Sequence, residues 1–219
     1  MTAVVIGAAG AIGAALADAL EARNESVLRL NRPALDLENE NSIRRAAEAA
    51  GTGLTLVISA AGLLHEPGAM PEKRLSDLDP ARLARAFAIN ATGPALLMKH
   101  FLPRLARHER TVFATLSARV GSIADNRAGG WYGYRASKAA LNQFVRTAAI
   151  ELARTHKAAC CVALHPGTVD SPLSRPFAKA GLDLQTPAEA AARLLGVIDA
   201  LTPEQTGLFF DQKGRPIPF

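Results

Sequence analysis

The chain is poor in cysteine and lacks long apolar runs. Its two cysteines, Cys160 and Cys161, are adjacent among 219 residues, which excludes a disulfide-rich scaffold. Neighbours in a strand point to opposite faces, so we expect two reduced packing residues and a cytoplasmic location. The longest apolar stretch, residues 54–64, falls short of the roughly 20 residues of a membrane span. No basic segment precedes the small apolar residues 3–17, which argues against a secretory signal.

Aromatic residues are also scarce, at 5%, while hydrophobic residues reach 49% and charged residues 21%. These values exclude a disordered chain and favour a core of aliphatic side chains from helices packed on a sheet. The net charge of +5 is spread thinly. The arginines at 82–85 and 104–110 fit solvated helix faces, so we expect neither nucleic acid nor membrane as a partner.

Short β-rich runs alternate with longer helical patterns. Strands are expected at residues 3–6, 26–30, 54–59, 111–116, 158–164 and 207–210, with a short one at 34–37. Helices are expected at 11–23, 39–50, 80–108 (capped by Asp79 and bent at Pro94 and Pro103), 132–155 and 187–201. This alternation predicts an α/β fold in which residues 1–219 form a single doubly wound, Rossmann-type domain. Its sheet is mostly parallel, with helices on both faces.

A glycine- and alanine-rich turn joins the first strand to the first helix. Small residues let the backbone approach a pyrophosphate, and the N–H groups at the following helix N-terminus favour an anion. The same residues also occur in tight turns that bind nothing, and it is the position after the first strand that favours a dinucleotide. The expected contacts in this segment are Gly7, Ala9, Gly10, Ile12 and Gly13.

The second strand ends in Asn31 and Arg32, where an NAD-binding chain would carry an acidic residue. An arginine can pair with a 2′-phosphate, which favours NADP(H) over NAD(H). The alternative interpretation of Arg32 is a surface turn residue before Pro33. Asp36, followed by Leu37, can reach an adenine amino group or cap the next helix.

Tyr134 and Lys138 are spaced i and i+4, so they share one face of the helix expected from residue 132. A phenol of pKa about 10 exchanges protons poorly at neutral pH. A nearby ammonium is expected to lower that pKa. Ser117, at the end of a strand, can hydrogen-bond a carbonyl or alcohol oxygen beside the phenol.

Together these segments resemble the short-chain dehydrogenase/reductase family over essentially the whole chain. Its glycine turn corresponds to Gly7, Ala11 and Gly13, with Ile6 replacing the usual Thr. Its Asn-Asn-Ala-Gly segment appears as Ser59-Ala60-Ala61-Gly62, without either Asn. Its Pro-Gly motif appears as residues 166–171.

The resemblance implies the functional residues. The catalytic set would be Asn90, Ser117, Tyr134 and Lys138. Tyr134 would be the general acid or base, Lys138 would lower its pKa and hold the nicotinamide ribose, Ser117 would orient the substrate oxygen, and Asn90 would support a water relay. Further cofactor contacts would come from Ala60, Ala61, Gly62, Pro166, Gly167, Val169 and Ser171, and no metal is implied.

Within the family, the segments 117–134 and 207–219 resemble the C-factor-like and sniffer-type carbonyl reductases. This implies NADP(H)-dependent hydride transfer to or from a small carbonyl or alcohol substrate: an aldehyde, ketone or quinone. The short segment between Ser171 and Pro187 predicts an open cleft. A homodimer or homotetramer, formed through the helices that carry Asn90 and Tyr134, is implied as well.

A second hypothesis comes from the same resemblance. C-factor-like relatives are associated with signalling, so the chain can alternatively be a nucleotide-binding sensor whose catalytic residues are vestigial. Trp131 has two interpretations: it lines the substrate site, or it belongs to the core or a subunit contact.

Overall fold

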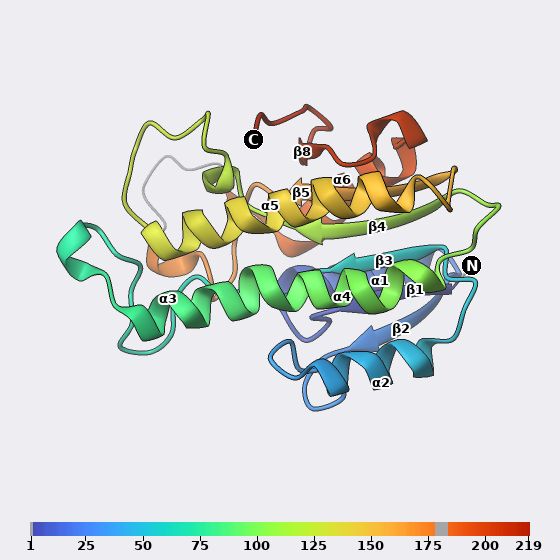
Figure 1. Cartoon of the computed structure of the whole chain (residues 1–219), viewed down its shortest axis with the longest axis horizontal. Coiled ribbons are helices and arrows are strands. Elements are labelled where there is room, and N and C mark those ends of the chain that lie inside the picture. The colour runs from blue at the N-terminus through green and yellow to red at the C-terminus, as the bar shows by residue number, and fades with distance from the viewer. Residues whose placement is uncertain (1, 178–183) are drawn as a thin grey trace.

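The computed structural model describes residues 2–177 and 184–219. Six parallel strands form the central sheet in the order β2-β1-β3-β4-β5-β8. Figure 1 shows helices on both sides of this sheet, as the sequence predicts. The strands are β1 Thr2–Ile6, β2 Ser26–Leu30, β3 Leu56–Ser59, β4 Thr111–Leu116, β5 Ala159–His165 and β8 Phe209–Asp211. A separate parallel pair, β6 Thr168–Val169 and β7 Leu184–Gln185, was not predicted.

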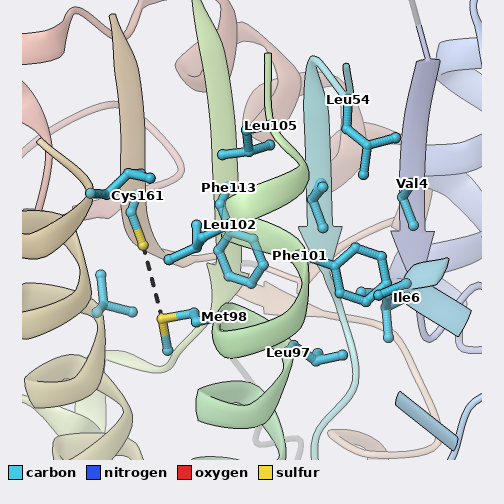
Figure 2. Close-up of a cluster of buried hydrophobic side chains, with 14 of the residues drawn as sticks. Val4, Ile6, Leu54, Leu97, Met98, Phe101, Leu102, Leu105, Phe113 and Cys161 are labelled. Carbon is cyan, nitrogen blue, oxygen red and sulfur yellow. Dashed lines mark hydrogen bonds between the residues drawn. The ribbon is translucent and has the colours of Figure 1, made fainter. Parts of the chain in front are cut away.

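The helices divide between the two faces of the sheet. They are α1 Ala11–Ala22, α2 Glu40–Ala50, α3 Pro80–Phe87, α4 Gly93–Phe101, α5 Tyr132–Leu152 and α6 Pro187–Ala200. Buried side chains of α2, α4 and α5 pack in one apolar cluster, and those of α1 and α6 in a second. In the first cluster, Phe101 of α4 lies over Val4 and Ile6 of β1 (Figure 2).

Side chains of alternate residues in each strand pack in one cluster or the other, so the sheet is apolar on both faces. Cys161 belongs to the first cluster, with its Sγ 3.9 Å from Met98 Sδ (Figure 2), and Cys160 belongs to the second. Both thiols are free and buried, as the adjacent positions predict. None of the described helices is long and apolar enough to cross a membrane.

Two predicted elements were wrong. Residues 34–37 form a turn instead of a strand: Leu35 and Leu37 are buried in the core beside that turn, and their apolar alternation reflects loop packing. The helix predicted over 80–108 is interrupted by a π-helical turn, Ala88–Thr92, and α4 ends at Phe101. Pro94 lies in the first turn of α4, where a missing N–H is tolerated, and Asp79 caps α3 as predicted.

Because all six strands are parallel, their carboxyl ends lie along one edge of the sheet. The turn after β1, the loop after β3, Ser117 after β4 and the segment after β5 therefore converge there. In Figure 1 this edge is on the left, together with α3 and the beginning of α5. It carries the predicted site.

Candidate active site

The turn after β1 requires glycine at two positions. Gly7 has φ +82°, and a Cβ there would lie 2.8 Å from the Ala61 amide nitrogen. A Cβ on Gly13 would lie 2.2 Å from the Gly7 carbonyl oxygen. The first turn of α1 therefore lies directly on the glycine turn, leaving its N-terminus open toward the edge of the sheet.

A groove of about 370 Å³ runs from this turn across the ends of β1, β2 and β3. Ten of the predicted cofactor contacts line it: Gly7, Ala9, Gly10, Asn31, Arg32, Asp36, Leu37, Ala60, Ala61 and Gly62. Ile12 and Gly13 do not line it, since they lie behind the turn in α1. The lining residues follow the ends of three neighbouring strands, an arrangement that suits an extended ligand.

The polar groups at the β2 end of the groove have different environments. Arg32 is exposed, and no carboxylate of the described residues forms an ion pair with it. The Asp36 carboxylate accepts the Glu38 N–H at 3.1 Å. Asn39 caps α2 by accepting the Ser42 N–H, so the interpretation of Asp36 as that cap is wrong. Arg32 is thus the cation available to an anion at this end.

Asn90 lies in the π-helical turn and is fully buried. Its Oδ1 accepts the Leu63 N–H at 2.8 Å, and its Nδ2 donates to the Leu63 carbonyl at 2.7 Å and to Ser137 Oγ at 3.2 Å. The side chain therefore joins the loop after β3 to α5. A Cβ on Gly62 would lie 3.5 Å from both Asn90 Oδ1 and Lys138 Nζ, so Gly62 leaves space between these groups.

Tyr134 and Lys138 occupy successive turns of α5, as predicted. Lys138 Nζ lies 5.8 Å from the centre of the Tyr134 ring and donates to the Leu116 carbonyl at 2.8 Å. Only 3% of Lys138 is exposed, and burial lowers its pKa to about 8. A lysine of this kind exchanges protons near neutral pH.

Burial acts on the Tyr134 phenol in the opposite direction to the prediction. The i, i+4 spacing predicts that Lys138 lowers the pKa of Tyr134, but desolvation raises the pKa of this phenol above its ordinary value. Burial favours the neutral form of each group, phenol and amine. At neutral pH Tyr134 is thus a protonated phenol.

Ser117 follows β4 and is 4% exposed. Its hydroxyl donates to Asn142 Oδ1 of α5 at 2.7 Å, and its N–H donates to the Leu164 carbonyl at 2.8 Å. Asn142 Nδ2 is in turn 3.5 Å from the Gly121 carbonyl. The serine side chain is therefore fixed by a partner that sequence reasoning missed.

A pocket of about 250 Å³ opens beside Tyr134, between the loop after β3 and α3. Near it, three aromatic side chains from distant segments meet. The centre of the Phe177 ring lies 4.9 Å from that of Trp131 and 5.6 Å from that of His65. The ring centres of Trp131 and Tyr134 are 6.3 Å apart. Trp131 therefore lies next to Tyr134, as the interpretation at the substrate site requires.

The segment after β5 contains the remaining predicted cofactor contacts. Gly167 has φ +79°, and a Cβ there would lie 2.3 Å from Gln185 Nε2 of β7. Gln185 Nε2 donates to the Pro166 carbonyl at 3.2 Å. Val169 is buried in β6, and Ser171 Oγ lies 3.2 Å from Ser174 Oγ. Residues 178–183, part of the short segment expected to leave the cleft open, lie outside the described residues.

Sequence reasoning also missed an ion-paired trio beside the groove and a buried acid. Arg85 of α3 forms ion pairs with Glu38 and Glu66, and all three line the groove. Glu72 is only 7% exposed and faces the pocket beside Tyr134. No group of His, Cys, Asp and Glu in the described part of the chain could hold a metal ion.

Comparison with known proteins places this geometry in a family. A family model described as enoyl-(acyl carrier protein) reductase matches residues 7–200. The C-signal protein of Myxococcus xanthus is 40% identical over 146 residues, which are 66% of this chain and 83% of that protein. A Rhodococcus dehydrogenase of 1-hydroxy-2-glutathionyl-2-methyl-3-butene is 32% identical over 183 residues, 83% of this chain and 77% of the relative. The chain belongs to the short-chain dehydrogenase/reductase family.

Solved structures of similar fold cover the whole of this short-chain dehydrogenase/reductase chain. The NADPH-bound carbonyl reductase from chicken fatty liver has a TM-score of 0.85 at 23% identity and is covered over 98% of its length. Carbonyl reductase Sniffer of D. melanogaster has a TM-score of 0.82 at 21% identity and is covered over 99%. These similarities establish the doubly wound fold, and the family makes the chain an oxidoreductase.

Proposed function

We propose that the chain is an NADP(H)-dependent reductase of aldehydes, ketones or quinones, in which Tyr134 donates the proton. The observation that carries the proposal is the position of Tyr134 and Lys138. These side chains share one face of α5, and the groove that begins at the glycine turn includes Gly62, next to Lys138 Nζ.

The groove fits a dinucleotide. Residues 7–11 are all Gly or Ala, and Gly7, Ala9 and Gly10 line the groove, so the backbone of the turn is accessible to a pyrophosphate. Arg32 would hold the 2′-phosphate, and Asp36 with Leu37 would border the adenine. Pro166, Gly167, Val169 and Ser171 would border the nicotinamide. When bound, the cofactor supplies or accepts the hydride. Two structures of similar fold, from chicken fatty liver and Burkholderia multivorans, carry NADPH and NADP.

Each catalytic side chain has a separate role. Tyr134 is a protonated phenol at neutral pH, which is the form that a general acid needs for carbonyl reduction. Because desolvation raises its pKa, the proton transfer requires the ammonium of Lys138 beside the ring. Lys138 stands beside the phenol with a pKa of about 8, so it can return a proton. Ser117 would orient the substrate oxygen after exchanging its hydrogen bond with Asn142. Asn90 would hold the loop at Leu63 in place and support the water relay to Lys138.

The surroundings of Tyr134 support an apolar or aromatic substrate. Phe177, Trp131 and His65 present ring faces and edges, and the neighbouring pocket includes Leu63, Leu64, Ala69 and Met70. Aromatic rings pack edge to face or offset against other flat rings, so a substrate with an apolar or aromatic group beside its carbonyl fits these surroundings.

We also propose that a second copy of the chain covers α4 and α5. A groove of about 540 Å³ lies between these helices, and Phe144 and Ile150 of α5 are 43% and 52% exposed. Exposed apolar side chains beside a groove are typical of subunit contacts. Two reduced, buried cysteines support a cytoplasmic location.

A second function, signalling with vestigial catalysis, is favoured by the 40% identity to the C-signal protein. Substitution of Tyr134 by Phe distinguishes the two. For a reductase, Y134F lowers the rate of NADPH oxidation with an aldehyde, ketone or quinone panel by about 100-fold or more. NADPH affinity, measured by calorimetry, stays within about twofold. Y132F alters the neighbouring tyrosine and serves as the matched control. Undiminished turnover in Y134F, or no nucleotide binding by the unaltered chain, would contradict the proposal and favour signalling.

A further inference from the structure

Helix α5 begins without a capping side chain of its own. Trp131 occupies the N-cap position in a left-handed conformation, with φ 54° and ψ 44°, and makes no side-chain cap. The first N–H groups of a helix need acceptors from elsewhere. Here Glu72, from the loop after β3, supplies two: its carbonyl accepts the Trp131 N–H at 2.5 Å, and its carboxylate Oε2 accepts the Gly133 N–H at 3.1 Å.

The Glu72 carboxylate fits closely against this first turn. A Cβ on Gly133 would lie 3.0 Å from Glu72 Oε1 and 3.1 Å from Leu83 Cδ2 of α3, so glycine at 133 lets the loop, α3 and α5 approach one another. Figure 1 shows these three segments together at one end of the molecule. Within the described residues, Glu72 has no Lys, Arg or His ion-pair partner. The carboxylate faces the N–H groups at the positive end of the helix dipole instead.

This contact is adjacent to the reacting group. Gly133 precedes Tyr134 directly, and Glu72 and Tyr134 line the same pocket. The other charged groups of the pocket have different partners: Arg85 pairs with Glu38 and Glu66, and Arg82 donates to the Met70 carbonyl. Glu72 is therefore the pocket carboxylate that is hydrogen-bonded to the helix carrying Tyr134 and Lys138.

We propose that Glu72 is a positioning residue, which fixes the first turn of α5 and thereby the Tyr134 phenol relative to the substrate oxygen. The inference rests on the proposed function of Tyr134. It predicts that loss of the acceptor affects turnover more than cofactor binding, since a misplacement of about 1 Å can lower a rate about 100-fold.

The test compares three variants at saturating NADPH. We expect E72A to lower kcat about 10- to 100-fold, with NADPH affinity within about twofold of the unaltered chain. E72Q keeps an oxygen that can accept the Gly133 N–H and should stay within about threefold. N39A removes the cap of α2 instead, so it should lower the midpoint of urea unfolding about as much as E72A does, with kcat unchanged. If E72A does not fold, E72D, which withdraws the carboxylate by one methylene, should show the same fall in kcat.

A spectroscopic measurement separates this inference from the proposed function. The chain has two tyrosines, so Y132F leaves Tyr134 as a single ¹³Cζ resonance in labelled protein. In that background E72A should shift or broaden the resonance, and E72Q and N39A should not, whether or not the protein reduces carbonyls. An unchanged resonance with E72A, a kcat within twofold of the unaltered chain, or an E72Q as impaired as E72A would overturn the positioning role.

Discussion

Lys138 Nζ donates to the carbonyl oxygen of Leu116, the last residue of β4, at 2.8 Å. The hydrogen bond fixes the amine at the carboxyl edge of the sheet, beneath the Tyr134 ring. Lys138 is almost fully buried, so its ammonium form loses hydration and the pKa of the amine falls. The hydrogen bond thus sets the position of the amine, and burial sets its proton affinity.

Replacement of Lys138 by Met should stabilise the fold while abolishing turnover. Burial lowers the pKa of Lys138 from 10.5 to about 8, so the unfolded chain binds more protons between those pH values. Desolvation of the Lys138 ammonium lowers the free energy of unfolding by roughly 3 kcal/mol at pH 7, and K138M removes this penalty. K138M also loses the hydrogen bond to the Leu116 carbonyl, which costs about 1 kcal/mol. We expect K138M to be more stable by about 2 kcal/mol at pH 7 in urea unfolding. That advantage should decline as the pH rises from 8 toward 10.5. K157M, at an exposed lysine, should show neither effect; an advantage of K138M that is independent of pH would contradict this origin.

Gly13→Ala should disrupt the glycine turn. The added Cβ would lie 2.2 Å from the Gly7 carbonyl oxygen, so either α1 or the turn must move. We expect a loss of about 1–3 kcal/mol in unfolding free energy and weaker NADPH binding. Gly196 in α6 is the control, since a Cβ there meets nothing within 4 Å. G196A should stabilise by about 0.4–1 kcal/mol. Equal effects from the two substitutions would argue against a close approach at Gly13.

Much of this architecture could be predicted because local pattern and tertiary position agree. Buried parallel strands such as β4 form continuous apolar runs in the sequence. The glycine turn directly follows β1, and this position indicates a dinucleotide-binding turn. The wrong elements have tertiary causes. Leu35 and Leu37 alternate like a strand but pack as a turn, and the interruption at Ala88–Thr92 accompanies the hydrogen bonds of Asn90 to Leu63.

The site shows the same division. Spacing places Tyr134 and Lys138 on one helix face, but it carries no information on their burial, which reverses the expected direction of the Tyr134 pKa shift. Glu72 is separated from Gly133 by sixty-one positions, and nothing in its own segment indicates a cap for a distant helix. Contacts between residues that are distant in sequence, such as Glu72 and Gly133, can be identified only from the structure.

Arg32→Ala should change the cofactor preference. If Arg32 pairs with the 2′-phosphate, its loss removes a charge-assisted hydrogen bond, which contributes about 1.5–3 kcal/mol. NADPH affinity should fall about 10- to 100-fold, while NADH affinity stays unchanged. Fluorescence of Trp131, the single tryptophan, reports both titrations, and calorimetry provides a second method. R44A removes an arginine paired with Glu48 on α2 and is the control. An equal fall in the affinities for NADPH and NADH would show that Arg32 supports the turn and does not contact the 2′-phosphate.

Phe144→Glu should prevent self-association through α5. The Phe144 side chain is 43% exposed beside the groove between α4 and α5, and a carboxylate there would be buried by a second copy. We expect sedimentation equilibrium to give a dimer or tetramer for the unaltered chain and a smaller species for F144E. L75E introduces the same charge at a residue that is 69% exposed in another region, and its mass should not change. Unaltered assembly of F144E would place the contact elsewhere.

Phe177→Ala should weaken the binding of aromatic substrates more than it slows the reaction. Phe177 reaches its position from the segment after β6 and contacts Trp131 and His65, which come from the start of α5 and the loop after β3. Removal of the ring loses aromatic contacts worth about 0.5–1.5 kcal/mol each. We expect KM for an aromatic aldehyde to rise about 10-fold, with kcat at saturation within about threefold, and KM for a small aliphatic aldehyde to change little. F219A, which removes a partly exposed ring stacked on Phe209, is the control and should leave KM for both aldehydes unchanged. If F177A raises KM equally for both substrates, the ring supports the shape of the cleft generally; if it lowers kcat alone, it acts on the placement of Tyr134 through Trp131. The aromatic selectivity proposed for this cleft requires that KM rise for the aromatic aldehyde and stay nearly unchanged for the aliphatic one.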